Sequence, residues 1–232
     1  MLIMLVYCNN VEIYLHIYIF YIPFILKYCW YDIMNDITIG YYDNNATKFI
    51  KETIDVDFSE MQNRFLKYIP YEGHILDFGC GSGRDTLAFI NQGYTVEPVD
   101  GSREMCRIAS GITGIYVRQM LFCDLNENAR YDGIWACASL LHLKRNELSD
   151  VFVKMHRALK NSGVAYVSFK YGDFEGERNG RYFTDMTEER FNGILEVTGG
   201  FSVDDMWITG DVRDGRSSER WMNVILRKKN MI

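Results

Sequence analysis

The densest group of residues able to do chemistry is the segment from residue 74 to 83, which reads HILDFGCGSG. A short apolar run ends in the acid Asp77, and glycines follow at the alternate positions Gly79, Gly81 and Gly83. A buried strand that ends in such a turn presents free backbone N–H groups on a surface without Cβ atoms, against which a small polar cofactor can lie. The carboxylate before the turn favours a cationic or hydrogen-bond-donating partner over a phosphate, so we expect a cofactor that carries an amino acid.

Two other glycine motifs do not fit this segment. A dinucleotide fingerprint needs G-x-G-x-x-G, but the third glycine position, counted from Gly79 and Gly81, is Arg84. A phosphate-binding P-loop needs Lys and then Ser or Thr after its last glycine, whereas Arg84 follows Gly83. The alternative is a tight turn that binds nothing. A second acid, Asp100, at the end of the next predicted strand disfavours that alternative, because a carboxylate there can accept both hydroxyls of a ribose.

Strand and helix patterns alternate through the rest of the chain and must position these residues. The predicted strands span 75–78, 95–99, 115–120, 133–137, 164–169, 202–209 and 221–227. Predicted helices between them span about 84–91, 102–109, 146–160 and 187–197. Ahead of the first strand, Asp43 is expected to cap one helix, and Ser59 with Gln62 forms a capping-box pattern for another. This order predicts an α/β fold: a doubly wound, Rossmann-like, seven-stranded and mostly parallel sheet, its last strand antiparallel, with helices on both faces.

Composition limits the classes of partner. The 232 residues carry a net charge of −6, so there is no overall basic field to hold a polyanion, and nucleic acid is a less favoured partner. The six cysteines include no C-x-x-C pair, which favours reduced thiols in a cytoplasmic protein and no metal site.

Residues 1–33 differ from the remainder in being dense in Ile, Tyr, Phe and Leu. Glu12, Pro23 and Lys27 interrupt the apolar stretch, and its uncharged part of about ten residues is short of the roughly 20 that span a membrane. The composition is that of translated A/T-rich upstream DNA, so we expect the native protein to start at Met34, with one domain over residues 34–232. A membrane-binding or partner-binding tail and a packed part of the fold are the alternatives.

Four motifs together resemble those of the class I S-adenosylmethionine-dependent methyltransferases, over about residues 41–228. They are DFGCGSG at 77–83, VDGS at 99–102, FCDL at 122–125 and YDGIWACASLLH at 131–142. Among subfamilies the chain is most similar to the small, tellurite-resistance-like methyltransferases. Pro98 departs from the pattern: the family fold makes the second strand internal, where a missing backbone donor is costly, so that strand either bulges or has stopped pairing there.

The resemblance implies S-adenosyl-L-methionine as the cofactor and gives individual residues roles toward it. Asp77 would lie near its α-amino group, Asp100 would bind the ribose hydroxyls, and Asp124 would meet the adenine edge. The residues expected to bind it are Tyr42, Asp77, Gly79, Cys80, Gly81, Gly83, Asp100, Gly101, Ser102, Met105, Asp124, Leu125 and Ala138. Tyr42 resembles the aromatic residue that such enzymes often fold over the cofactor. As alternatives, Met105 would face the core and Asp124 would cap a turn.

The expected reaction is methyl transfer by in-line displacement to a small, anionic acceptor. The sulfonium is an activated donor, so the enzyme must mainly align a nucleophile and exclude water. His142 is the candidate base if the acceptor must lose a proton, and the alternative is that it caps or packs against the next helix. A polar loop over residues 170–183 is expected to form the acceptor pocket, for which the candidates are Lys170, Tyr171, Arg178, Arg181 and Arg216.

Alternatives to this function are also open. The loop after the fifth strand would, on the plainer interpretation, be a solvated segment held by Arg–carboxylate pairs. The chain would otherwise be a methyltransferase that acts on RNA or protein, or a regulatory protein that binds S-adenosylmethionine without catalysis.

Overall fold

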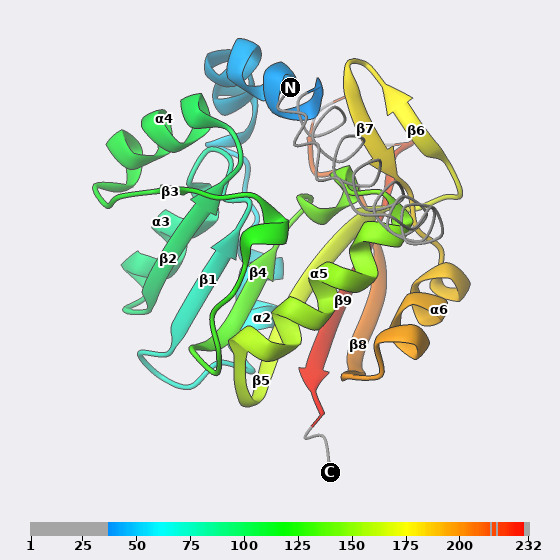
Figure 1. Ribbon diagram of the computed structural model, residues 1–232. Helices are drawn as coiled ribbons and strands as arrows, with labels where there is room; N and C mark the ends of the chain where they lie inside the picture. The colour runs from blue at the N-terminus through cyan, green and yellow to red at the C-terminus, as the bar shows by residue number, and fades with distance from the viewer. Residues whose placement is uncertain (1–36, 214, 217, 230–232) are drawn as a thin grey trace, which may run out of the picture. The chain divides into compact units, whose positions relative to one another are not determined.

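A computed structural model describes residues 37–213, 215–216 and 218–229 of this chain (Figure 1). The residues from Thr38 onward form one compact unit. The expectation that the native chain starts at Met34, and every expectation for residues 1–33, lies outside the described residues. None of the helices that the structure describes is both long and apolar enough to cross a bilayer.

A seven-stranded sheet, in the order β3-β2-β1-β4-β5-β9-β8, forms the centre of the fold. Its strands are β1 (His74–Phe78), β2 (Thr95–Asp100), β3 (Arg118–Gln119), β4 (Tyr131–Ala136), β5 (Leu159–Lys170), β8 (Phe201–Gly210) and β9 (Arg220–Lys228). β9 runs antiparallel to both of its neighbours, β5 and β8, and the other strand pairs of this sheet are parallel. The predicted doubly wound sheet with an antiparallel last strand is therefore confirmed.

Helices connect the strands and cover the sheet. One helix covers residues 37–53, and the others are α2 (Ser59–Leu66), α3 (Arg84–Asn91), α4 (Arg103–Thr113), α5 (Arg145–Ala158) and α6 (Glu188–Thr198). Two short 3₁₀ helices, η1 (Phe122–Asp124) and η2 (Leu140–His142), follow β3 and β4. The strand order reverses between β1 and β4, so the carboxyl ends of these two strands border the crevice in which such sheets bind ligands.

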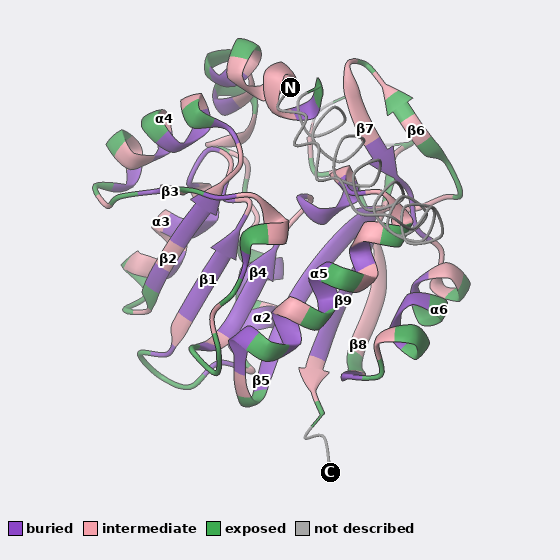
Figure 2. Ribbon diagram, in the orientation of Figure 1, coloured by how far each residue is buried: buried purple, intermediate pink, exposed green. Residues whose placement is uncertain are grey.

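The alternation of side chains along each central strand builds two cores. In β4, Ile134 and Ala136 join the core beneath α5 and α6, whereas Trp135 joins the core beneath α2 and α3. In β5, Val167 and Tyr166 divide in the same way. The central strands β1, β4, β5 and β9 are accordingly buried along most of their length (Figure 2). Because both faces are covered, these strands read as continuous apolar runs in the sequence.

Two of the predicted helix caps are wrong. Asp43 lies inside the helix of residues 37–53 and does not cap it. Its carboxylate accepts hydrogen bonds from Ser102 Oγ (2.5 Å) and Glu104 N (3.2 Å), at the start of α4. The capping box at Ser59 and Gln62 is also absent, because Gln62 Nε2 donates to Asp85 Oδ1 (2.7 Å) instead. Both side chains serve tertiary contacts, which a local capping pattern does not reveal.

Pro98 lies in an unbulged part of β2. Val99 O accepts from Gly79 N on the β1 side, so the neighbouring Pro98 directs its nitrogen toward β3. The ladder with β3 holds only two pairs, Val99 with Arg118 and Asp100 with Gln119. The backbone donor that Pro98 lacks therefore lies before the first β2–β3 pair and costs no hydrogen bond of that ladder. Strand β3, at residues 118–119, is shorter than the predicted 115–120.

The segment expected as a polar loop contains a β-hairpin. Strands β6 (Glu175–Arg178) and β7 (Arg181–Thr184) pair antiparallel in a separate two-stranded sheet. Asn179 (φ 54°) and Gly180 (φ 74°) form the two-residue turn between them. Asn-Gly is a strong hairpin signal because both residues tolerate positive φ, and the sequence analysis missed it.

Candidate active site

The glycine turn is held against the end of β2 by backbone contacts. Gly79 N and Cys80 N both donate to Val99 O, at 3.0 and 2.9 Å. The turn needs glycine at position 79, where φ is 92° and a Cβ would lie 2.5 Å from Ser139 Cβ. Gly83, with a φ of 78°, starts α3 in the left-handed conformation. The backbone thus passes close to the segment that follows β4, on the border of the ligand crevice.

Asp100 joins the glycine turn to the start of α4. Its Oδ2 accepts from Gly81 N and its Oδ1 from Ser102 N, both at 2.9 Å. Removal from water raises the pKa of Asp100, and these backbone hydrogen bonds oppose that rise. Ser102 also caps α4, since its Oγ accepts from Met105 N (3.1 Å). Three of the predicted cofactor residues are therefore in direct contact.

Asp77 is a buried carboxyl without an ion-pair partner among the described residues. It is 2% exposed and accepts from Thr86 Oγ1 at 2.5 Å. Burial, and then the charge of Asp85, raise the pKa of Asp77 to about 8. Asp85 itself is satisfied by Arg84, Gln62 and Trp135. Asp77 is the group of this pair that would gain from a cationic ligand.

The other predicted cofactor residues fall into three environments. Met105 and Leu125 are buried in apolar clusters, so at Met105 the structure favours the core alternative. Cys80 packs with Cys106 in a small cluster beneath α4. Asp124 is exposed in η1.

Two more predicted residues lie at the crevice. Ala138 has a φ of 50°, and its N donates to Ser168 Oγ at 2.8 Å. A Cβ on Gly101 would lie 3.4 Å from Ile39 Cδ1, so the backbone after β2 packs against the helix of residues 37–53.

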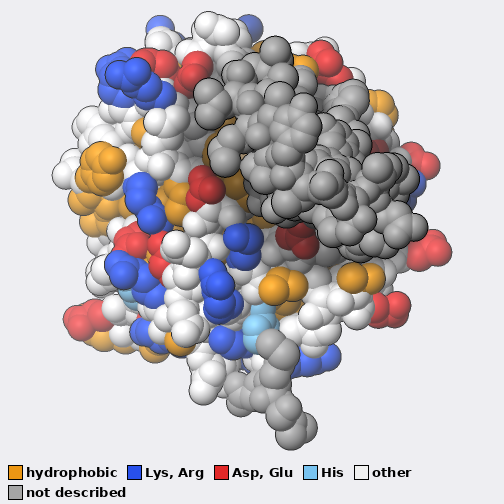
Figure 3. Space-filling model, in the orientation of Figure 1, with side chains coloured by type: hydrophobic (Ala, Val, Ile, Leu, Met, Phe, Trp, Pro, Cys, Tyr) orange, Lys and Arg blue, Asp and Glu red, His pale blue; other side chains and the backbone are white. Residues whose placement is uncertain are grey.

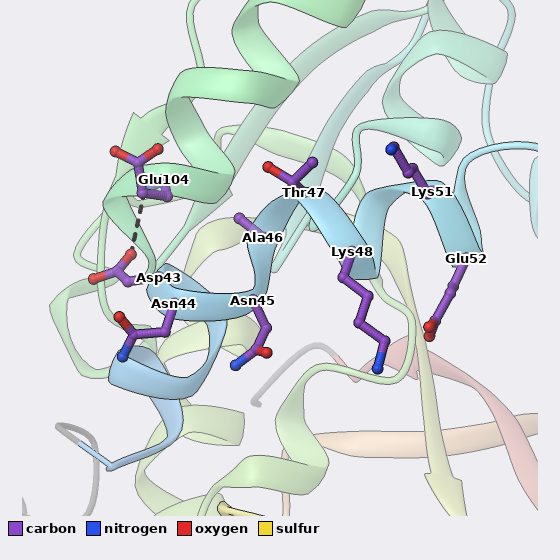
Figure 4. Close-up of a pocket in the computed structure, with 9 residues that line it drawn as sticks. All are labelled: Asp43, Asn44, Asn45, Ala46, Thr47, Lys48, Lys51, Glu52 and Glu104. Atoms are coloured by element: carbon purple, nitrogen blue, oxygen red, sulfur yellow. Dashed lines mark hydrogen bonds between the residues drawn. The ribbon is translucent and has the colours of Figure 1, made fainter.

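That helix lies over the glycine turn. A Cβ on Gly81 would be 3.6 Å from the ring of Phe49, and Asp43 holds the start of α4 through Ser102 and Glu104. Figure 4 shows the other side of the helix, where a surface pocket is lined by Asp43, Asn44, Asn45, Ala46, Thr47, Lys48, Lys51, Glu52 and Glu104. The lining includes neither the glycine turn nor Asp77 or Asp100, so this pocket is not the candidate site.

Tyr42, His142 and Arg181 meet beside this helix. Tyr42 Oη lies 2.8 Å from His142 Nε2, and Arg181 Nη1 donates to Tyr42 Oη at 3.3 Å. His142 Nδ1 lies 2.6 Å from the carbonyl oxygen of Tyr182. Loss of hydration lowers the pKa of His142 to about 4. The structure thus brings together the expected cofactor-covering aromatic, the candidate base and one candidate acceptor residue.

The remaining acceptor candidates are paired with carboxylates. Arg178 Nη2 lies 2.8 Å from Asp185 Oδ2. Lys170 and Arg216 both pair with Glu219, and Tyr171 Oη donates to Glu188. The structure therefore favours the plainer alternative of a segment held by carboxylates, in Arg–carboxylate pairs at Arg178 and Arg216 and by other contacts at Lys170 and Tyr171. Arg181 stands apart: among the described residues it has no carboxylate within ion-pair distance, and its Nε is buried without a hydrogen-bond partner.

Sequence comparison finds a family model with the description methyltransferase domain, matched by residues 75–163. An uncharacterized methyltransferase of Staphylococcus carnosus is 28% identical over 141 residues, which cover 58% of this chain and 67% of that protein. A putative methyltransferase of Bacillus subtilis is 28% identical over 120 residues, covering 45% of this chain and 47% of its own length. An 18S rRNA (guanine-N(7))-methyltransferase of Schizosaccharomyces pombe is 26% identical, covering 58% and 54%.

Solved structures share the fold. A 1,6-didemethyltoxoflavin-N1-methyltransferase of Burkholderia thailandensis, crystallised with 1,6-didemethyltoxoflavin and S-adenosylhomocysteine, has a TM-score of 0.69 at 20% identity. The match covers 88% of this chain and 90% of that one. A SAM-dependent methyltransferase of Methanosarcina mazei has a TM-score of 0.64 at 18% identity, covering 71% and 96%.

Proposed function

We propose that this chain is a class I S-adenosylmethionine-dependent methyltransferase, and that it transfers the methyl group of S-adenosyl-L-methionine to a small acceptor that carries an anionic group. The observation that carries the acceptor part is Arg181, whose charge is uncompensated among the described residues, next to Tyr42 and His142.

The residues at the crevice fit the cofactor. S-adenosylmethionine has an α-ammonium, two ribose hydroxyls and a sulfonium, and the buried carboxyl of Asp77 suits the ammonium. Asp100 is fixed by two backbone N–H groups and has lone pairs left for hydroxyls. Gly79 and Gly81 present backbone without Cβ atoms. When bound, the cofactor supplies a methyl group on a good leaving group, and the chain's own task is to orient it and exclude water.

Aromatic rings surround the Arg181 guanidinium. Its Cζ lies 4.5 Å from the centroid of the Tyr41 ring and 5.1 Å from that of Phe183. A guanidinium held between rings keeps its planar donor edges for a carboxylate or phosphate, which it binds in bidentate fashion. Arg178, directly opposite Arg181 in the hairpin, is neutralised by Asp185. Of this cross-strand pair, Arg181 is the one able to bind an acceptor's anionic group.

Two measurements test the proposal. Calorimetric titration of the full chain with S-adenosylmethionine should show binding, and its absence would refute both the enzymatic and the regulatory alternatives. Transfer of a labelled methyl group should then be assayed with three pools: metabolites below about 1 kDa, total RNA and total protein. Label in the metabolite pool supports the proposal. Label in RNA or protein favours the alternative in which the chain acts on a polymer, as the Schizosaccharomyces pombe relative does.

The hairpin supplies a matched pair of variants for the acceptor. Arg181→Gln should raise the KM of the acceptor roughly tenfold or more, the equivalent of a lost charge-assisted hydrogen bond. Arg178→Gln removes a charge of the same kind from the facing strand, where Asp185 already neutralises it. It should leave that KM unchanged. Equal effects of the two variants would contradict an anion site at Arg181.

A further inference from the structure

Tyr42, His142 and Arg181 lie on three elements that are far apart in the sequence, and they are in contact with one another in the fold. Tyr42 comes from the helix of residues 37–53, His142 from η2, and Arg181 from the first position of β7. The hairpin and the helix are tied together: Tyr182 N donates to Thr38 Oγ1 at 3.0 Å. The His142 ring also packs edge-on against Tyr42 and Phe183. The cluster is thus fixed from three sides.

The hydrogen bonds of His142 set the direction of the protons. The carbonyl oxygen of Tyr182 can only accept, so Nδ1 of His142 carries the hydrogen of that 2.6 Å contact. In a neutral imidazole the other nitrogen is then an acceptor, so Tyr42 donates its hydroxyl hydrogen to His142 Nε2 at 2.8 Å. Arg181 reaches the same phenol oxygen only as a donor. Tyr42 Oη therefore keeps lone-pair capacity for one more donor.

The hydrogen bonds of Tyr42 and His142 are arranged as a proton relay requires. A hydroxyl whose hydrogen already points at an imidazole can take up a proton from a substrate while it gives its own to that imidazole. The second ring nitrogen is held by a fixed acceptor, as in other nucleophile–imidazole pairs. We propose that Tyr42 is the catalytic group that receives the acceptor's proton, with His142 Nε2 as the final proton acceptor, and that the methyl acceptor is a hydroxyl compound with an anionic substituent. This inference rests on the proposed function.

The step balances as follows. The hydroxyl oxygen of the acceptor forms a bond to the methyl carbon while the carbon–sulfur bond of the donor breaks, and the electron pair of that bond stays on sulfur. The hydroxyl proton moves to Tyr42 Oη as the Tyr42 proton moves to His142 Nε2. One positive charge disappears at sulfur and one appears on the imidazole, so the net charge of the crevice is unchanged. The imidazolium gives its proton to water after product release.

The weak basicity of His142 fits a hydroxyl better than an amine. Burial is the main cause of its low pKa, and Arg181 is the charged group that lowers it further. An imidazole with a pKa of about 4 still accepts a proton from a methylated hydroxyl oxygen, which is a much stronger acid. It could not hold a proton against an amine product, whose pKa is near that of lysine, about 10.4. The geometry provides a place for the acceptor's hydrogen-bond donor at Tyr42 Oη, and the weak basicity of the imidazole favours a hydroxyl over an amine as that donor.

One arm of the test needs no acceptor. In the full chain labelled with ¹⁵N-histidine, with and without S-adenosylhomocysteine, His142 should show a protonated Nδ1 and a hydrogen-bond-accepting Nε2. Tyr42→Phe should shift the Nε2 signal, and Tyr116→Phe, at a remote exposed tyrosine, should not. A protonated Nε2 with a bare Nδ1, or a signal insensitive to Tyr42→Phe, would overturn the relay.

The second arm measures transfer from S-adenosylmethionine with a labelled methyl group to the metabolite pool. Tyr42→Phe and His142→Gln should each lower kcat roughly a hundredfold or more, as for loss of general base catalysis, while the Kd for S-adenosylmethionine is unchanged. The labelled methyl group should be on oxygen. Label on nitrogen, sulfur or carbon, or a wild-type kcat in Tyr42→Phe, would overturn the inference. If S-adenosylmethionine does not bind at all, the proposed function itself fails, whatever the ¹⁵N spectra show.

Discussion

The two halves of the crevice are built by different means. The proposed cofactor side is formed mainly by backbone groups: the glycine turn, the N–H groups of Gly81 and Ser102, and the start of α4. On the proposed acceptor side, side chains from a helix, a 3₁₀ turn and a hairpin meet at Tyr42. A site made of backbone groups is determined by a few consecutive residues, whereas a site made of side chains depends on distant segments that pack together. Small local changes of the backbone should therefore disrupt the first half, and removal of single functional groups should disrupt the second.

The largest effect is expected from Gly79→Ala. The left-handed φ costs about 1–3 kcal/mol of strain, and a Cβ 2.5 Å from Ser139 Cβ adds a steric clash. Gly180→Ala in the hairpin is the matched change on the acceptor side. Its φ is 74° and its nearest neighbour is a Tyr41 ring atom at 3.3 Å, so we expect about 1–2 kcal/mol there. Urea denaturation of both variants measures the difference, and equal losses would contradict the contrast between the two halves.

Asp100→Ala should come next. It removes the acceptor of two backbone N–H groups as well as the proposed ribose ligand, so S-adenosylmethionine should bind roughly 1–3 kcal/mol more weakly. Asp173→Ala, at an exposed residue ahead of the hairpin, is the control and should bind it normally. Calorimetry gives both affinities. Unchanged binding in Asp100→Ala would exclude the ribose role.

Asp77 should make cofactor binding depend on pH. Its pKa of about 8 is raised, so the free protein holds this carboxyl neutral below that pH, and pairing with the α-ammonium requires loss of the proton. Affinity should therefore rise with pH, by up to about tenfold per unit, to a maximum near pH 8, above which the α-ammonium of the ligand loses its own proton. Asp77→Asn should flatten the profile. If the affinity of the wild-type protein does not change between pH 6 and 8, Asp77 does not face the ammonium.

The same raised pKa predicts the opposite trend for folding. A carboxyl that is easier to protonate in the folded state stabilises the fold at low pH, and this contribution is lost as the pH rises through the folded pKa. The free energy of unfolding, measured in urea without cofactor, should therefore decline between about pH 4 and 8, and less so in Asp77→Asn. Opposite pH trends for cofactor binding and for folding stability, both reduced in Asp77→Asn, would identify Asp77 as the group that titrates in both.

The smallest effect is expected where the two halves are joined. Asp43, on the helix that carries Tyr42, accepts hydrogen bonds at the start of α4. Asp43→Ala should cost about 0.5–2 kcal/mol of unfolding free energy, as for a lost helix cap. Asn44→Ala, at the exposed neighbouring position, should cost less. If the two variants unfold alike, the helix is held to α4 by its apolar contacts alone.

The same contrast explains what could be predicted from the sequence. Apolar runs and the glycine turn are local signals, so the main sheet, its antiparallel strand and the position of Asp100 at the end of the second strand followed from them. Asp43 was misjudged because its partners lie about 60 residues away in the chain. The cluster of Tyr42, His142 and Arg181 required the hairpin, whose Asn179-Gly180 signal was present and was not used.

The position of β9 has a consequence for synthesis of the chain. Strand β5 has β4 on one side, but its other edge is covered only by β9, which is the last strand of the sheet to be made. Until residue 228 has left the ribosome tunnel, the apolar stretch from Val164 to Phe169 presents an unpaired edge, the kind of surface that invites aggregation. Translation thus exposes this chain to aggregation until its last strand has emerged, even though the glycine turn is synthesised much earlier.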